Sequence, residues 1–317
     1  MIWTVTANPA VDITYRVDHV DLGEVHRIHV VTERPGGKGL NVACTLDSLG
    51  EQVCATGFLG GANGQQVEDL LTVTHPNVLH RFVPVQTQTR RSVAIVDAAG
   101  RATVFNEAGT PREEADWERL RIVLGEVHAG DVVAISGSMP PHTDEHVLPD
   151  LIKQVKSAGA SVLVDTSGPA LLLAARAGAD MLKPNREELL EATGASTLSE
   201  GVRRLLDMGA GMVALSMGKD GMTAAGLDED GTMVALHSVS NRDVTGNPTG
   251  AGDASVAAWC QVFADPTITT VRQRLAGVGE AVAVSTAAVA SLVAGEFDAE
   301  ELAIQRGPKI EELTHDW

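Results

Sequence analysis

The sequence contains few basic residues. Its 24 lysines and arginines stand against 42 aspartates and glutamates, which gives a formal net charge of −18 over 317 residues. Such a chain repels polyanions and anionic membrane surfaces, so we expect neither nucleic acid nor a membrane as partner. A small anion can still bind where basic residues gather locally, because bulk repulsion is screened beyond roughly 8–10 Å at physiological salt.

Cysteine and long hydrophobic runs are also scarce. Cys44, Cys54 and Cys260 lie in apolar surroundings without CxxC spacing, which predicts small core residues in a reducing compartment. The longest weakly polar stretch, 281–295, is too short and too rich in alanine to span a bilayer. Residues 1–10 lack the basic region of a secretory signal. We therefore expect a cytoplasmic protein.

Several common catalytic motifs are missing. There is no GxxxxGK[ST] motif, which excludes a P-loop enzyme. Residues 209–214 match GxGxxA, but they follow a predicted helix and enter a predicted strand, the reverse of a dinucleotide-binding fingerprint. His142 and His146 do not form HExxH and have no evident third ligand, which favours solvated histidines over a metal site.

The sequence does contain a regular alternation of strand and helix patterns, most clearly after residue 113. This alternation predicts an α/β fold, with a mostly parallel sheet covered by helices on both faces. Strand-like alternation at 13–20 and 25–32, and a predicted hairpin at 92–97 and 102–106, indicate a small second sheet. A single strand is expected at 78–85, and only helices are expected after residue 237.

The stretch 246–259, GNPTGAGDASVAAW, is the strongest candidate for chemistry. Gly250, Ala251 and Gly252 begin a predicted helix, where free amides and the positive end of the dipole favour a phosphate. Asp253 follows in the first turn and could act as a base for a hydroxyl brought to that anion. The alternative is that Asp253 only complements the dipole and the glycines only form a tight turn.

Two stretches near the N-terminus could contribute to the same site. Gly36 and Gly37 allow a ligand to approach the backbone closely, while Lys38 and Asn41 add a positive charge, a donor and an acceptor. A plain strand–turn–helix connection is the alternative. Asp12 follows the first strand, where open α/β sheets place ligand groups, although an aspartate in a surface turn is equally common.

Two later loops complete the candidates. Ser136 and Ser138 offer hydroxyls at the carboxyl end of a predicted strand. Lys183 precedes Asn185, a good helix N-cap, and Glu188 three residues later can complete a capping box. The functional alternative is that this amide and carboxylate hold hydrated Mg²⁺ near the phosphates of ATP.

These stretches occur in a fixed order: NPAVD (8–12), GEVHR (23–27), PGGKGLNVA (35–43), Thr89-Arg90, SGSMPP (136–141), KPNREEL (183–189), SMGKDG (216–221) and GAGD (250–253). Over nearly the whole chain this order resembles the ribokinase-like (PfkB) carbohydrate kinases. The early motifs are most similar to the branch of 1-phosphofructokinase, tagatose-6-phosphate kinase and the minor 6-phosphofructokinase.

The resemblance implies that residues 1–317 form one ribokinase-like kinase domain with a small β-sheet lid from insertions at about 12–33 and 88–107. It implies ATP- and Mg²⁺-dependent phosphorylation of a hydroxyl of a sugar phosphate, namely a ketohexose phosphate such as fructose 1-phosphate, tagatose 6-phosphate or fructose 6-phosphate. It also implies a homodimer formed through the lid. A kinase for an unphosphorylated sugar or nucleoside, and a catalytically silent sugar-phosphate sensor, remain as alternatives.

The resemblance further implies a role for each candidate residue. Asp253 would be the general base, and Gly250, Ala251 and Gly252 the anion hole. The residues facing the sugar would be Asp12, Gly36, Gly37, Lys38, Asn41, Arg90, Ser136 and Ser138. The residues contacting ATP would be Lys183, Asn185, Ser216, Gly218, Gly221, Gly250 and Gly252. Asn185 and Glu188 would hold Mg²⁺ through water.

The sequence departs from the family pattern near the expected phosphate subsite. The branch often has asparagine and lysine where this chain has Ser92 and Ala94. Arg91 is a candidate to replace the lost charge, and Arg27 a further basic residue of the lid. If residues 90 and 91 alternate on a strand, one of the two arginines is simply solvated.

Overall fold

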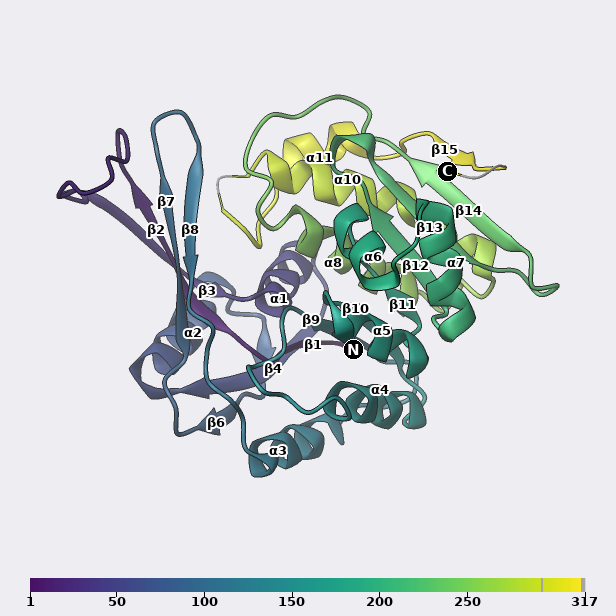
Figure 1. Cartoon of the computed structure of the whole chain (residues 1–317), viewed down its shortest axis with the longest axis horizontal. Coiled ribbons are helices and arrows are strands. Elements are labelled where there is room, and N and C mark those ends of the chain that lie inside the picture. The colour runs from purple at the N-terminus through teal and green to yellow at the C-terminus, as the bar shows by residue number, and fades with distance from the viewer. Residues whose placement is uncertain (292, 315–316) are drawn as a thin grey trace.

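The computed structural model describes residues 1–291, 293–314 and 317, whose strands form two sheets (Figure 1). The larger sheet has eleven strands and is parallel from β12 across to β5, with antiparallel strands at the other edge. Its order is β15 (Ile310–Glu312), β14 (Met233–Ser238), β13 (Met222–Leu227), β12 (Met212–Ser216), β11 (Met181–Leu182), β10 (Ser161–Asp165), β9 (Val132–Ser136), β1 (Ile2–Thr6), β4 (Val53–Gly60) and β5 (Leu79–His80), while β6 (Val83–Val85) also pairs with β4.

Neighbouring side chains of each central strand enter two separate cores, as the alternation of a strand requires. On β1, for example, Ile2 belongs to one buried cluster and Trp3 to the other. Helices supplying the first cluster are α1 (Lys38–Ser48), α2 (Gly61–Thr74), α8 (Ala251–Ala264), α9 (Val271–Leu275), α10 (Val278–Val289) and α11 (Ala299–Gln305). Helices supplying the second are α3 (Glu114–Leu124), α4 (Val147–Ser157), α5 (Pro169–Arg176), α6 (Arg186–Thr193) and α7 (Leu198–Met208). The predicted α/β fold, with helices on both faces of a mostly parallel sheet, is therefore confirmed.

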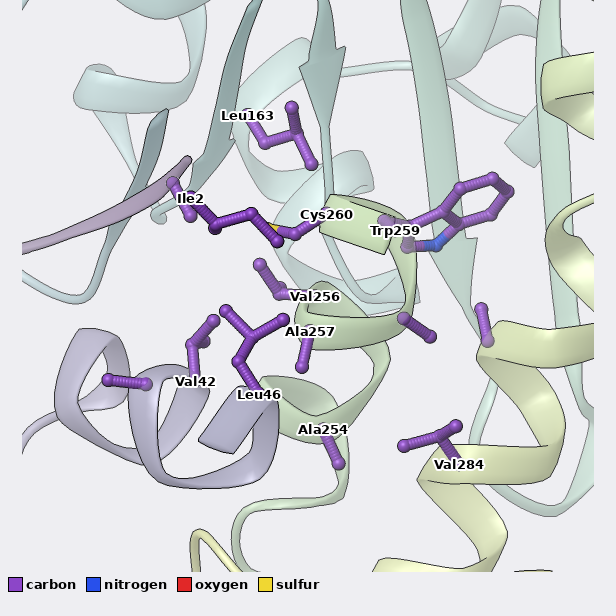
Figure 2. Close-up of a cluster of buried hydrophobic side chains, with 14 of the residues drawn as sticks. Ile2, Val42, Leu46, Leu163, Ala254, Val256, Ala257, Trp259, Cys260 and Val284 are labelled. Atoms are coloured by element: carbon purple, nitrogen blue, oxygen red, sulfur yellow. The ribbon is translucent and has the colours of Figure 1, made fainter. Parts of the chain in front are cut away.

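Helix α8 lies at the centre of the first cluster, between α1 and α10 (Figure 2). Trp259 and Cys260 are fully buried, and small residues such as Ala257 allow the neighbouring helices to approach closely. A helix that is apolar around most of its circumference has to be enclosed in this way. The enclosure fixes the position of its N-terminal turn, which carries Asp253.

The smaller sheet projects from the main body (Figure 1) and has the order β3 (Val30–Gly36), β2 (Ala10–Arg16), β7 (Arg90–Val96) and β8 (Ala102–Asn106). Strands β2 and β7 are parallel, and the other two pairs are antiparallel. On β2, Val11 and Ile13 are buried in the first cluster. Asp12 points to the opposite face, in register with Ser92 of β7.

Several predicted boundaries were wrong. The strand expected at 13–20 is β2, which begins at Ala10, and its partner begins at Val30 instead of residue 25. Asp12 therefore lies within a strand of the smaller sheet and not in a turn after β1. The strand expected at 78–85 is divided into β5 and β6, which both pair with β4.

The chain after residue 237 is not entirely helical, because β15 extends the large sheet beside β14. All three residues of β15 are exposed, so this strand is held by backbone pairing and not by an apolar pattern. Among the described residues, no helix has the length and apolar character needed to cross a membrane.

Candidate active site

Three adjoining cavities lie at the carboxyl ends of the parallel strands, the usual position of ligands in open α/β sheets. The large cavity has a volume of about 870 Å³, the central cavity about 350 Å³ and the small cavity about 270 Å³. The large and central cavities share Ser216 at the end of β12, while the central and small cavities share Lys38 and Arg90. A ligand with two parts could therefore reach from one cavity to the next.

Asp253 lines the central cavity from the first turn of α8. Gly250, the N-cap, has a φ of 87°, a left-handed conformation that favours glycine. The carboxylate is 6% exposed and accepts a hydrogen bond of 2.8 Å from Nδ2 of Asn41. Burial raises the pKa of Asp253 to about 7, and the charge of Asp165 adds to this rise. The carboxylate is thus poised to gain or lose a proton near neutral pH.

Asp165, at the end of β10, is a residue of this site that the sequence analysis missed. Its side chain is 1% exposed, and its Oδ1 lies 3.4 Å from Nζ of Lys38 and 3.5 Å from Nζ of Lys183. Both lysines line the central cavity. The rule that drew attention to Ser136, a polar residue at the carboxyl end of a strand, applies equally to Asp165 and could have found it.

The glycine pair before α1 makes room for Asp12. A Cβ atom on Gly36 would lie 2.2 Å from Cγ of Asp12, so only glycine allows the carboxyl group its place. Gly37, with a φ of 111°, is the N-cap of α1 and lines the central and small cavities together with Lys38. Burial raises the pKa of Asp12 to about 6, although Arg90 opposes the rise. Asp12 and Arg90 both line the central cavity, two register positions apart on the paired strands β2 and β7.

Arg90 connects the central and small cavities. Its Nε donates to the carbonyl of Asn8 over 3.1 Å, and its Nη1 donates to the carbonyl of Glu107 over 3.1 Å. Ser136 and Ser138 line the small cavity, where Oγ of Ser138 accepts a hydrogen bond of 3.4 Å from Nδ2 of Asn8. Polar side chains from three separate parts of the chain therefore converge there, from the start of β7, from the end of β9 with the loop after it, and from the loop before β2.

Arg91 and Arg27 do not join this group. The side chain of Arg91 extends from the other face of β7, and its Nη2 donates to Oδ1 of Asn63 over 3.1 Å. Arg27 is exposed in the segment 17–29, which has no regular strand, and it lines none of the three cavities. The suggestion that Arg91 replaces the missing family lysine was therefore wrong, and alternation along the strand explains its position.

The large cavity contains the remaining candidates. Gly218, Gly221 and Ser216 form one wall, and the segment 243–248 with residues of α10 forms another. Ala251 and Gly252 bring the N-terminus of α8 into the same cavity. This wall combines backbone amides with apolar side chains, as a nucleotide site requires.

Asn185 and Glu188 form the capping box of α6. The backbone N–H of Glu188 donates to Oδ1 of Asn185 over 2.8 Å, and the N–H of Asn185 donates to Oε2 of Glu188 over 2.9 Å. The structural interpretation is therefore confirmed, yet both residues also line the central cavity. Their oxygen atoms suit a hydrated Mg²⁺ ion, a hard cation that retains several waters and binds chiefly to phosphates.

The pfkB family of carbohydrate kinases matches residues 5–302. The chain belongs to this family. It is 31% identical over 266 residues to a tagatose-6-phosphate kinase of Staphylococcus epidermidis, an alignment that covers 81% of this chain and 83% of the relative. Among solved structures, Escherichia coli phosphofructokinase-2 in complex with potassium has a TM-score of 0.86 at 26% identity, covering 96% of this chain and 97% of that one.

A Thermotoga maritima protein described as a possible 1-phosphofructokinase has a TM-score of 0.80 at 22% identity, covering 99% of both chains, and supports the fold alone. The resemblance found in the sequence motifs is thereby confirmed. The protein is a carbohydrate kinase of the pfkB family, similar to tagatose-6-phosphate kinase. Kinases of this family generally use ATP and a divalent metal ion.

Proposed function

We propose that this kinase transfers the γ-phosphoryl group of ATP to a hydroxyl of a ketohexose phosphate. The observation that carries the proposal is the position of Asp253, at the start of α8 and between a cavity suited to a nucleotide and one rich in polar donors. The similarity to tagatose-6-phosphate kinase over most of the chain supports the same substrate class. Another structure of E. coli phosphofructokinase-2, at 26% identity to this chain, contains fructose-6-phosphate.

In the proposed reaction, Asp253 accepts the proton of the sugar hydroxyl while the hydroxyl oxygen forms a bond to the γ-phosphorus. The bond from the γ-phosphorus to the bridging oxygen breaks, and ADP leaves with the electron pair. The amides at Gly250, Ala251 and Gly252 would stabilise the negative charge on the transferred group, aided by the ammonium groups of Lys38 and Lys183. For this, the N–H of Ala251 would exchange its 3.2 Å hydrogen bond to the carbonyl of Pro248 for the anion.

The sugar would occupy the central and small cavities. Asp12, Asn41 and the backbone at Gly36 and Gly37 are available for its hydroxyl groups, and Arg90 for its existing phosphate. Ser136 and Ser138 add hydroxyl groups at the phosphate end, where Asn8 donates to Oγ of Ser138. Bidentate pairing of a guanidinium with a phosphate is among the stronger polar contacts in proteins.

The nucleotide would occupy the large cavity, with Lys183, Asn185, Ser216, Gly218 and Gly221 along its path. Asn185 and Glu188 would hold Mg²⁺ through water, and the ion would neutralise part of the charge on the phosphates. Glu188 lines the central cavity and its Oε2 accepts from the backbone of Asn185, which leaves Oε1 for this contact.

We further propose that residues 1–317 act as one kinase unit in which the smaller sheet is the lid. Closure over the sugar would exclude water from the reacting groups. Large apolar side chains remain exposed on both outer strands of this sheet, including Val31 at 51% and Phe105 at 59%. Packing of two lids in a homodimer would cover them.

A screen of the purified protein with ATP and Mg²⁺ against sugars and sugar monophosphates tests the proposal. We expect a ketohexose phosphate to exceed every unphosphorylated sugar and nucleoside in kcat/KM. A neutral sugar or nucleoside as the best substrate would contradict the proposal and favour the alternative kinase. Tight binding of sugar phosphates without any ATP turnover would indicate the silent sensor.

A further inference from the structure

We propose that Asp165 is a positioning residue, which holds the ammonium groups of Lys38 and Lys183 on either side of the place where the phosphoryl group is transferred. The proposal rests on the proposed kinase function of this site. It assigns a role to a buried carboxylate that the reaction scheme above does not use.

A single oxygen of Asp165 serves both lysines. Oδ1 lies 3.4 Å from Nζ of Lys38 and 3.5 Å from Nζ of Lys183, so the two ammonium groups are held close together. The lysines arrive from different elements, Lys38 from the start of α1 and Lys183 from the end of β11. Within the described residues, Asp165 is the only ion-pair partner of either ammonium, so its loss would leave no shared contact to fix one relative to the other.

The two ammonium groups lie toward different parts of the site. Lys38 is 42% exposed and lines the small cavity as well as the central one. Lys183 is only 5% exposed, and its Nζ would lie 3.3 Å from a Cβ atom on Gly252. The missing side chain of Gly252 therefore leaves room for this ammonium at the N-terminus of α8. One lysine is thus on the sugar side and the other at the anion-binding turn.

Burial explains why a carboxylate is needed there. An ammonium group as deeply buried as that of Lys183 is costly unless an opposite charge compensates it. Within the described residues, Oδ2 of Asp165 and the neighbouring Oγ of Ser136 are buried without a hydrogen-bond partner. A carboxylate that served only the scaffold would normally have both oxygens satisfied. The contacts of Asp165 are instead directed to the two cations of the site.

The charge of Asp165 also acts on the base. Asp253 is faced by Lys38 and Asn41 from α1, by Lys183 from the end of β11 and by Asp165 from the end of β10. Asp165 is the member of this group whose charge favours the protonated form of Asp253. Loss of that charge would lower the pKa of the base, whereas a purely structural contact would leave the pKa unchanged.

The substitution Asp165→Asn tests the proposal, because it keeps the shape of the side chain and removes its charge. We expect kcat to fall by roughly 10- to 100-fold, less than the roughly 10²–10³ for removal of a donor that contacts the transition state, because Asp165 acts through the two lysines. Both KM values should change less. The value of kcat/KM should decline on the acidic side of its pH profile, and this decline, the acidic limb, should move to lower pH in the variant. In a Lys183→Met background the same substitution should lower kcat much less, because the two residues act together.

The matched control is Asp47→Asn, which removes the charge of a partly buried carboxylate whose Oδ2 lies 3.0 Å from Nδ1 of His75, outside the three cavities. It should lower the melting temperature without moving the acidic limb. If Asp165→Asn does not fold, the smaller Asp165→Ser gives the same measurements. An unmoved acidic limb, or a kcat within about twofold of wild type, would overturn the proposal.

The test separates this inference from the proposed substrate. All variants are assayed with whichever acceptor the wild type phosphorylates best. If that acceptor is a neutral sugar, the proposed substrate class fails, yet the shift of the acidic limb still decides the role of Asp165.

Discussion

Asn41 donates a hydrogen bond from Nδ2 to Oδ2 of Asp253 over 2.8 Å, although the two residues are 212 positions apart in the chain. The bond joins the first turn of α1 to the first turn of α8, and both side chains are buried. It orients the carboxylate and leaves the other oxygen, Oδ1, for a substrate hydroxyl. Because it stabilises the charged form, it also opposes the effect of burial on the pKa of Asp253.

Replacement of Asp253 by asparagine should abolish most turnover while leaving binding nearly intact. The amide has almost the same shape and can still accept from Asn41, but it cannot take the proton of the hydroxyl. Positioned general bases contribute roughly 10²–10⁴ in rate, and we expect a loss of kcat in that range. Calorimetric titration with ATP and sugar phosphate checks binding. A variant that retains more than about a tenth of the wild-type kcat would rule out the assignment.

The pH dependence of activity should report the same carboxylate. With a pKa of about 7 in the folded protein, Asp253 is protonated and inactive as a base at lower pH. The value of kcat/KM for the wild type should therefore decline as the pH falls through about 7, since this ratio reports groups of the free enzyme. A profile that stays flat down to pH near 5 would contradict the raised pKa.

The free energy of unfolding should fall as the pH rises through the range in which activity increases. The pKa of Asp253 is raised from 3.8 to about 7 on folding, so between these values the folded state binds more protons than the unfolded state. Ionisation of Asp253 therefore lowers the free energy of unfolding as the pH rises through this window. Asp253→Asn should melt at a higher temperature than wild type at pH 8, with a smaller difference at pH 5. Calorimetric scans at both pH values provide the measurement.

Glu188→Gln should raise the Mg²⁺ concentration needed for half-maximal rate. The glutamine retains an acceptor for the backbone N–H of Asn185, but one negative charge near the hydrated ion is lost. Because the capping box can survive, the melting temperature should change little. Glu191→Gln, on the same helix but outside all three cavities, is the matched control. A drop in melting temperature with an unchanged Mg²⁺ dependence would reduce Glu188 to its structural role.

The protein should be a dimer at micromolar concentration, joined through the smaller sheet. Phe105 on β8 is 59% exposed and Val31 on β3 is 51% exposed, and the strand register places both on the same face of the sheet. Phe105→Asp should weaken the dimer, because a charge would then have to be buried in the contact. Sedimentation equilibrium of the wild type and of the Phe105→Asp variant provides the measurement. A compact wild-type monomer would defeat the prediction.

Features that depend on local chain geometry could be predicted from the sequence. The glycine-rich start of α8 and the capping box of α6 each involve residues within a few positions of one another, and both lie where expected. The order of strands and helices in the main sheet was likewise accessible, because burial on both faces produces apolar runs. The strand β15 was not, since its three exposed residues are held by pairing with β14.

Features that depend on distant partners were harder to predict. The role we propose for Asp165 requires Lys38, 127 positions away in the chain, and no local pattern indicates that contact. The sequence alone also did not decide which of Arg90 and Arg91 extends from the face of β7 that lines the cavity. A shift of one residue in a strand exchanges its two faces, so only the pairing of β7 with β2 determines which arginine reaches the cavity.

This pair of arginines gives the sharpest test of the proposed substrate. Arg90 lines the central and small cavities, whereas its neighbour Arg91 extends from the other face of β7 to Asn63. Arg90→Ala removes a guanidinium that a substrate phosphate could pair with, and a charged hydrogen-bonded contact is worth about 1.5–3 kcal/mol. The KM for the sugar phosphate should therefore rise roughly 10- to 100-fold, while the KM for ATP changes little.

Arg91→Ala is the matched control, because it removes the same side chain one residue away. It should leave both KM values within about twofold of wild type, since surface contacts of this kind contribute little. If the two substitutions raise the KM for the sugar phosphate equally, the arginines act by long-range electrostatic attraction and Arg90 makes no specific contact with the phosphate. A rise in the KM for neutral sugars as large as that for sugar phosphates, in the Arg90 variant, would show that Arg90 shapes the cavity without recognising the phosphate.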